Sequence, residues 1–180
     1  MITVKIKKIS YYHPSRSYAV ILEEIEGDRN LPVLVGAYEA QSIAMAMEFV
    51  ETPRPLTHDL IVNMINEING KVSSIKITKV EDGVYFSSIN IYSKALGSKN
   101  IDSRPSDALA IALRMHSPIL VAEEVMSEAI VWEEDSLIIE DEIKQSPEIE
   151  VLEQQLQKAI DKEQYEIAAR IRDKIKDIFS

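Results

Sequence analysis

The order of apolar and polar positions along the chain predicts short strands interrupted by helices. Residues 2–9 alternate between apolar side chains and Thr or Lys, which is typical of a strand with one buried face. Val72 to Val80 and Val84 to Ser93 also alternate, and Glu81-Asp82-Gly83 between them predicts a hairpin turn. Residues 94–100 are polar and are expected to form a loop. The strands expected from these patterns span residues 2–9, 18–25, 31–35, 72–80, 84–93 and 119–122.

Other segments repeat their apolar residues at helical spacing. One helix is expected after Gly36, and another at Thr57, whose hydroxyl is the expected cap. A third opens at Pro105, with Ser106 as its cap, and ends before Pro118; a short helix over 123–129 follows. The buried stripe expected for the second helix is Leu60, Ile61, Met64, Ile65 and Ile68. Together the elements predict an α+β fold with a mixed, largely antiparallel sheet packed with helices.

Charge divides the chain into three parts. Residues 1–122 hold 13 basic and 13 acidic residues, whereas residues 123–150 hold 1 and 11, so this short stretch carries the whole net charge of −10. We therefore predict a main domain at 1–132, an acidic linker at 133–147 and a third segment at 148–180. That segment has two apolar stripes, which predict a helical hairpin: Ile149, Leu152, Leu156 and Ile160, then Ala168, Ile171, Ile175 and Ile178.

Composition excludes several classes of protein. The chain has no cysteine, which excludes disulfides, thiolate metal sites and a cysteine nucleophile and fits a reducing cytoplasm. We expect no signal peptide in the N-terminal residues and no membrane span, because no apolar segment is long enough, so we also expect a cytoplasmic protein without membrane contact. Sheet edges and the stripes of the hairpin predict a homo-oligomer. The neutral main domain lacks the broad basic field of a tight duplex binder, so any nucleic acid would be held weakly, by local contacts.

Candidate chemistry lies at two similar helix starts, residues 54–60 and 102–109, which each place Arg-Pro near an Asp. A helix N-terminus offers free N–H groups and partial positive charge, so Arg54, Arg104 and Ser106 are candidate phosphate ligands. Carboxylates beside a phosphate suit Mg²⁺ or Mn²⁺, and the candidate metal ligands are Asp59, Asp102, Asp107 and Glu39. His58 is a candidate general acid or base, or a ligand. The spacing alone also fits plain helix capping.

Known signatures of other enzyme classes are absent. The sequence contains no glycine-rich dinucleotide motif, no P-loop, no zinc-protease motif and no Ser-His-Asp signature.

Three motifs in these segments carry a resemblance to a known family. LPVLVGAYE at 31–39, PRPLTHDL at 53–60 and IDSRPSDA at 101–108 resemble the bifunctional nuclease family, over roughly residues 1–135. The resemblance implies a compact α+β domain that cleaves both DNA and RNA. Residues 148–179 resemble the UVR motif of excision-repair proteins, notably at Tyr165-Glu166 and Ile171-Arg172-Asp173, which implies a helical hairpin that contacts another protein.

These patterns lead to a hypothesis and a rival. The hypothesis is a metal-assisted nuclease with His58, Asp59 and Asp107 as catalytic residues and a protein partner bound through residues 148–180. The rival is a non-enzymatic regulatory or stress adaptor that binds an anionic ligand and a protein. Convergence of the aspartates in one cleft favours the enzyme, and their dispersal favours capping.

Overall fold

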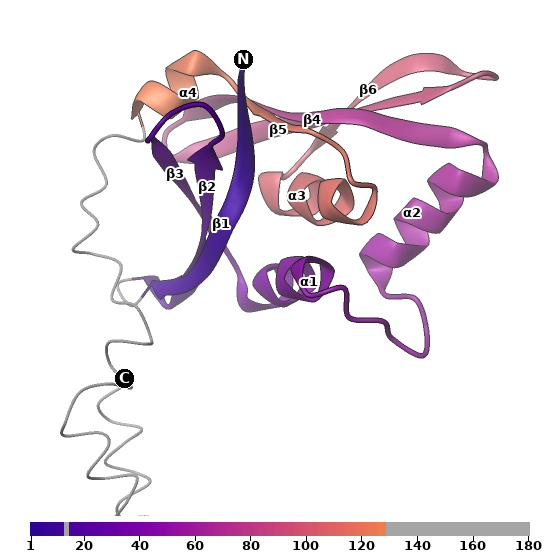
Figure 1. Ribbon diagram of the computed structural model, residues 1–180, viewed down its shortest axis with the longest axis horizontal. Coiled ribbons are helices and arrows are strands. Elements are labelled where there is room, and N and C mark those ends of the chain that lie inside the picture. The colour runs from indigo at the N-terminus through magenta and orange to yellow at the C-terminus, as the bar shows by residue number, and fades with distance from the viewer. Residues whose placement is uncertain (13–14, 129–180) are drawn as a thin grey trace, which may run out of the picture. The chain divides into compact units, whose positions relative to one another are not determined.

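The residues that the structure describes form a sheet of seven strands in the order β3-β2-β1-β7-β4-β5-β6. The computed structural model describes residues 1–12 and 15–128 (Figure 1). Every neighbouring pair of strands is antiparallel except β4 and β7, which are parallel. The strands are β1 (Ile2–Tyr12), β2 (Ser17–Glu24), β3 (Asn30–Val35), β4 (Gly70–Glu81), β5 (Val84–Ser93), β6 (Gly97–Ser103) and β7 (Ile119–Val121). The predicted α+β class and mixed, largely antiparallel sheet are confirmed.

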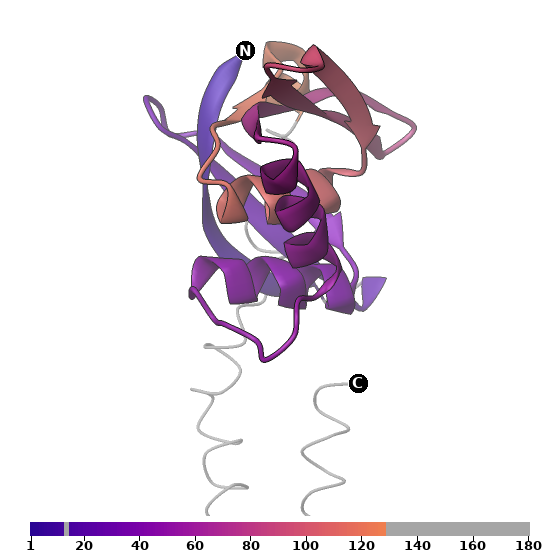
Figure 2. The same ribbon diagram turned by 90° about the vertical axis from the view of Figure 1, so that its right-hand side faces the viewer.

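In the described part of the chain, four helices accompany the sheet: α1 (Ala37–Met47), α2 (Thr57–Glu67), α3 (Pro105–Arg114) and α4 (Glu123–Glu128). Figures 1 and 2 show α1 and α3 lying one above the other, with α2 across them. Helix α3 is central because it packs against α1, α2, β4 and β5. Residues 108–112 of α3 are all buried, and three of the five are alanines, so neighbouring elements can approach its backbone closely. The helix therefore brings the ends of several elements together.

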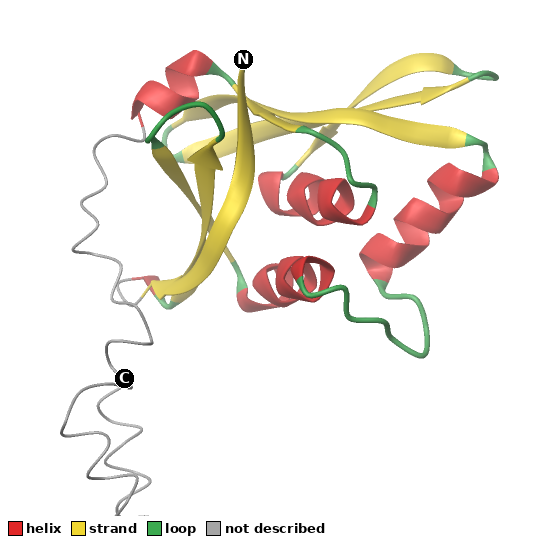
Figure 3. Cartoon of the chain, in the orientation of Figure 1, coloured by secondary structure: helices red, strands yellow, loops and turns green. Residues whose placement is uncertain are grey.

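The core lies between these helices and the sheet. Leu22 and Leu31 from one half of the sheet, Ile75 and Ile77 from the other, and Ile43 of α1 are fully buried in one cluster with α3. Burying a side chain of this kind stabilises the fold by about 1.5–3 kcal/mol. Figure 3 shows the loop between α1 and α2 running outside this core. The position of α2 is therefore fixed by its packing against α3 and not by this loop.

One strand was not predicted. Residues 94–100 were expected to be a loop, but Gly97–Ser103 forms β6 and pairs antiparallel with β5 from Ser93↔Gly97 to Ser87↔Ser103. The prediction was wrong because β6 lies at the sheet edge and buries no side chain fully, so it has no apolar alternation. Backbone hydrogen bonds to β5, together with the Ser87 hydroxyl donated to the Ser103 carbonyl at 2.7 Å, hold it in place.

Helix α2 buries less than its pattern predicted. Ile65 is buried and Ile61 packs against the core, but Leu60, Met64 and Ile68 are exposed. The two sets lie on adjacent faces, and α2 meets the core along one edge only. The predicted five-residue buried stripe was therefore too wide.

The predicted linker at 133–147 and hairpin at 148–180 lie outside the described residues. Within the described part of the chain, no helix is both long and apolar enough to cross a membrane. The domain boundaries, the compartment and the homo-oligomer stay predictions.

Candidate active site

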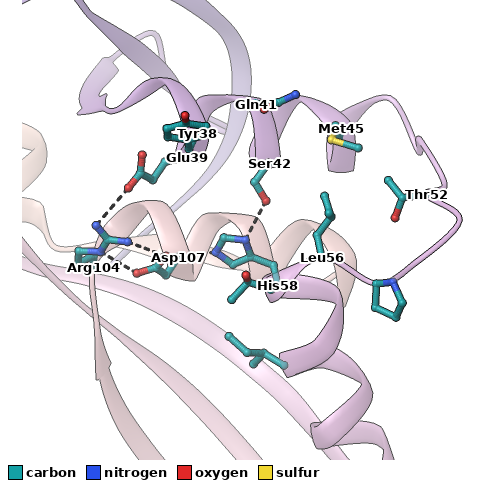
Figure 4. A pocket seen from close by; sticks show the side chains of 13 residues that line it. Tyr38, Glu39, Gln41, Ser42, Met45, Thr52, Leu56, His58, Arg104 and Asp107 are labelled. Atoms are coloured by element: carbon teal, nitrogen blue, oxygen red, sulfur yellow. Dashed lines mark hydrogen bonds and ion pairs between the residues drawn. The ribbon is translucent and has the colours of Figure 1, made fainter.

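A cavity of about 930 Å³ lies where α1, α2 and α3 meet. Figure 4 shows the polar side chains that line it, which come from all three helices. They include Glu39 and Ser42 of α1, His58 of α2, Arg104 at the start of α3 and Asp107 in its first turn. Met45, Leu56 and Ile61 supply apolar walls. A concave site with a few convergent polar groups is the usual form of a ligand or active site.

His58 is held between two partners on different helices. Its Nδ1 lies 2.8 Å from Ser42 Oγ, and its Nε2 lies 3.1 Å from Asp107 Oδ1. Burial raises the pKa of the Asp107 carboxyl, but hydrogen bonds from Arg104 and His58 outweigh it, so this pKa lies below its usual value. An ionised carboxylate only accepts, so Nε2 carries a proton. In the neutral ring, Nδ1 is then the acceptor, and the Ser42 hydroxyl donates to it.

Arg104 carries the positive charge of the cavity. Its Nε donates to Asp107 Oδ2 at 2.9 Å and its Nη2 to Asp107 Oδ1 at 3.2 Å, which is a bidentate pair. Its Nη1 donates to Glu39 Oε1 at 3.2 Å. The Asp107 and Glu39 partners raise the pKa of Arg104 further above its ordinary value. The side chain is still 67% exposed, so it can reach an incoming anion.

A second ionic cluster, formed by Asp59 and Arg114, joins the same three helices without lining the cavity. Arg114 Nε of α3 donates to Asp59 Oδ1 of α2 at 2.6 Å, and Nη1 donates to the main-chain oxygen of Ser42 of α1 at 3.1 Å. The other Asp59 oxygen accepts from the Leu56 N–H at 2.8 Å and so caps α2. Asp59 therefore fixes the helices that carry Ser42 and His58.

The cavity and its supporting cluster lie in a segment that matches a known family model. The model for the bifunctional nuclease domain matches residues 20–134. The chain belongs to the bifunctional nuclease domain family. The model for the UvrB/uvrC motif matches residues 148–178, so both resemblances seen in the sequence are confirmed.

Relatives of this bifunctional nuclease domain occur in bacteria and plants. An uncharacterized protein of Mycobacterium tuberculosis (strain H37Rv) is 34% identical over 155 residues, which cover 86% of the chain and 88% of that protein. Bifunctional nuclease 1 of Arabidopsis thaliana is 25% identical over 179 residues, which cover 87% of the chain and 55% of that protein. Bifunctional nuclease 1 of Oryza sativa subsp. japonica is 28% identical over 109 residues, which cover 58% of the chain and 32% of that protein. The chain thus spans about half or less of these named plant nucleases.

The residues predicted for the site separate into two groups. The structure brings His58, Asp107, Arg104 and Glu39 together in the cavity. Arg54 and Asp102 are exposed and do not line it, and Asp59 faces Arg114 instead. The three aspartates therefore do not converge in one cleft, and the capping alternative holds for Asp59, which accepts from the Leu56 N–H at the start of α2. Ser106 is buried beside a smaller hollow that Arg104 and Glu39 also line.

The similarity of the two helix starts is only partial. Leu56 is the N-cap of α2 and Arg104 the N-cap of α3, so Asp59 and Asp107 both stand at the third helical position. Arg54, however, lies two residues before its cap, whereas Arg104 is itself the cap. The predicted caps Thr57 and Ser106 are wrong: each lies inside the first turn, and neither helix has a cap bond from its N-cap side chain. Pro105 and the Asp59 carboxylate define the starts instead.

The carboxylates of this bifunctional nuclease domain do not fit a resident Mg²⁺ or Mn²⁺ ion. Among residues 1–12 and 15–128, no three His, Asp or Glu side chains are grouped so that they could hold a metal. Glu39 and Asp107 both bind Arg104, so a guanidinium lies where a cation would bind. The metal dependence therefore stays a prediction.

Sequence reasoning missed two residues of this site, Ser42 and Arg114. Ser42 is a small hydroxyl inside an apolar, alanine-rich helix, where it resembles ordinary filler. It stands three residues after Glu39, and this spacing puts both on one helix face. Arg114 is the lone basic residue of α3 and ends an otherwise apolar run. A charged residue at the end of a buried helix usually has a partner, so Arg114 could have predicted an ion pair with another element.

The Asp59–Arg114 pair predicts a pH-dependent stability. Burial raises the pKa of Asp59, but hydrogen bonds from Arg114 and the Leu56 N–H outweigh it and lower the pKa below 3.8. The stabilisation is therefore present above pH 3.8 and is lost as the pH falls through the lowered value. We expect Asp59→Asn to cost about 1–2 kcal/mol at neutral pH and much less in acid, measured by urea unfolding. Asp102→Asn, an exposed control, should leave the free energy of unfolding unchanged at both pH values. An equal loss of stability for Asp59→Asn at neutral and at acid pH would show that the Asp59–Arg114 pair is not the source of the pH dependence.

Proposed function

We propose that the cavity between α1, α2 and α3 cleaves phosphodiester bonds of DNA and RNA. The observation that carries the proposal is the placement of His58, between Ser42 and Asp107, in a cavity that also contains Arg104. An arginine at a helix N-terminus suits a phosphate, because its N–H groups match the oxygens and the helix end is electropositive. An oriented histidine beside it can move a proton. Membership of a nuclease family supports the same chemistry.

Each group has a separate part in this proposal. Arg104 binds the phosphate and stabilises the charge that grows on its oxygens during the reaction. Glu39 and Asp107 hold the guanidinium in place until the phosphate arrives. His58 accepts a proton through Nδ1, since Nε2 is fixed by Asp107. Asp59 acts through Arg114 and the α2 cap, so it is a positioning residue.

The direct test is cleavage of single-stranded DNA and of RNA by the purified full chain. Products would be followed by gel electrophoresis with added Mg²⁺ or Mn²⁺ and, in parallel, with excess EDTA. We expect both substrates to be cut and the activity to persist in EDTA, because Arg104 already supplies a cation. Activity that requires the metal would contradict the expected metal-independent cleavage and would support the metal-assisted nuclease predicted from the sequence. Binding without cleavage in either condition would favour the adaptor function.

Arg104→Ala should weaken the interaction with the phosphate more than it affects proton transfer by His58. The variant loses a charged hydrogen-bond donor to phosphate, worth about 1.5–3 kcal/mol, so kcat/KM should fall about ten- to a hundredfold. Arg104→Lys should recover part of this loss, since it keeps the charge but not the bidentate geometry. Arg29→Ala is a matched control, because Arg29 pairs with Glu24 and Glu123 and does not line the cavity. Equal kcat/KM for Arg104→Ala and Arg29→Ala would remove Arg104 from the proposal.

We also propose that residues 148–180 bind a protein partner, on the strength of the UvrB/uvrC motif match. The partner should be retained by the full chain and lost with Ile171→Asp, which puts a charge into an apolar stripe of the motif. Unchanged capture by this variant would contradict the proposal.

A further inference from the structure

Ser42 is a hydroxyl that the proposed chemistry has not used, although it faces the centre of the cavity. The residue is only 8% exposed, but it lines the cavity wall (Figure 4). Serine inside a helix commonly donates to the carbonyl one turn earlier. Here its Oγ instead lies 2.8 Å from His58 Nδ1. The hydroxyl is therefore turned away from its own helix and toward a base.

The backbone of Ser42 is fixed as well. Its carbonyl oxygen accepts from Arg114 Nη1 at 3.1 Å, and Arg114 is anchored by Asp59 at 2.6 Å. The Arg114 side chain is only 11% exposed, so this support is shielded from water. A nucleophile needs such constraint, because small errors in position sharply reduce rates of attack.

The three side chains Ser42, His58 and Asp107 form a continuous series of hydrogen bonds. The order is hydroxyl, imidazole and carboxylate, the arrangement by which a serine nucleophile is activated, and such an arrangement is recognised by geometry and not by sequence order. The ring nitrogens are exchanged relative to serine proteases, since Nδ1 here faces the serine and Nε2 faces the aspartate. Either ring nitrogen can accept a proton while the other donates. The sequence contains no Ser-His-Asp motif, but the fold brings a serine, a histidine and an aspartate together in this order.

We propose that Ser42 is a catalytic nucleophile that forms a covalent phosphoserine diester with the cleaved nucleic acid strand. The inference rests on the proposed phosphodiester cleavage and names the group that attacks phosphorus. Arg104 then supplies the positive charge at the phosphate.

Cleavage through Ser42 consumes only the phosphodiester and one water molecule. Ser42 Oγ forms a bond to phosphorus while its proton moves to His58 Nδ1. The bond from phosphorus to the departing ester oxygen breaks, and that oxygen takes the proton from His58. Water then attacks the same phosphorus, giving one proton to His58, and the Oγ–phosphorus bond breaks as Oγ regains a proton. The net change is hydrolysis of one diester to a phosphate monoester and an alcohol.

The first test requires no nucleic acid. The full chain would be treated with a biotinylated alkyl fluorophosphonate, which forms a stable Oγ–phosphorus bond with an activated serine and releases fluoride. Peptide mass spectrometry should place the label on Ser42, and His58→Gln should slow labelling at least tenfold. Ser42→Ala should abolish it, whereas Ser10→Ala, which removes a buried hydroxyl of β1, should leave it unchanged. Unlabelled Ser42, or equal rates in wild type and His58→Gln, would overturn the proposal.

The second test uses stereochemistry, which a merely structural serine cannot alter. Cleavage of a phosphorothioate diester of one configuration in oxygen-18 water should proceed with retention at phosphorus, because two displacements each invert it. Inversion would show direct attack by water, which overturns the role of Ser42 but leaves phosphodiester cleavage intact. Failure of the wild type to cut any DNA or RNA would instead overturn the proposed function, and the fluorophosphonate result would still decide whether Ser42 is activated.

Discussion

We expect His58→Ala to lower kcat/KM for single-stranded DNA and RNA by about 10²–10⁴-fold, the usual contribution of a positioned general acid or base. The expectation follows from the two hydrogen bonds of His58, which fix its ring between Ser42 and Asp107. Without the imidazole, the hydroxyl has no acceptor and the carboxylate has no ring to orient. The loss should appear mainly in kcat, since Arg104 remains available to bind phosphate.

The control for His58 is His116→Asn. His116 is exposed, lies away from the cavity and has a φ of 48°, a conformation that asparagine tolerates better than most residues. Both variants should have wild-type circular dichroism. Rates for His58→Ala within about threefold of the control would exclude His58 from proton transfer, because even a weak general base contributes more.

Arg114→Met should produce the largest loss of stability. The substitution keeps most of the aliphatic length but removes the donors to Asp59, to the Ser42 carbonyl and to the Ala110 carbonyl. Removing one partner of a buried ion pair costs about 3–5 kcal/mol, and we expect about 2–4 kcal/mol because Asp59 is 32% exposed and stays partly hydrated. For a chain of this size the melting temperature should fall by roughly 5–15 °C.

A double-mutant cycle separates the ion pair from general packing. Asp59→Asn and Arg114→Met together should cost less than the sum of the two single variants, since each removes the same interaction. Arg29→Met, which disrupts an ion pair nearer the surface, should cost much less than Arg114→Met, because exposed ion pairs contribute little to stability. Strict additivity at positions 59 and 114 would show that the pair contributes little and that Arg114 acts through its packing alone.

The helices and strands were largely predictable because the apolar pattern within most of these elements shows which of their faces is buried. The alternation in residues 72–80 and 84–93 predicts β4 and β5, and Glu81-Asp82-Gly83 predicts their turn, where Asp82 and Gly83 both have positive φ. Strand β6 was not predictable in this way, because a polar edge strand is specified by the neighbour that it pairs with. The exposure of Leu60 and Met64 likewise depends on how α2 is placed against the core.

The site was predictable in part, for a related reason. Arg104 and Asp107 lie in one helix start, so local sequence reveals them as a pair. The partnership of Asp59 with Arg114, 55 residues away, depends on three helices meeting, and no local pattern specifies it. The same holds for Ser42, whose role arises only from the ring that α2 places beside it.

The three helices that build the cavity each supply one member of the Ser42, His58 and Asp107 series, and these members are spread over 65 residues of chain. A polypeptide emerging from the ribosome exposes Ser42 and His58 well before Asp107 has been added. Under the proposed function, a nascent, misfolded or partly degraded copy would therefore cut no nucleic acid, because the series of hydrogen bonds arises only on completion of the tertiary structure and disappears with it.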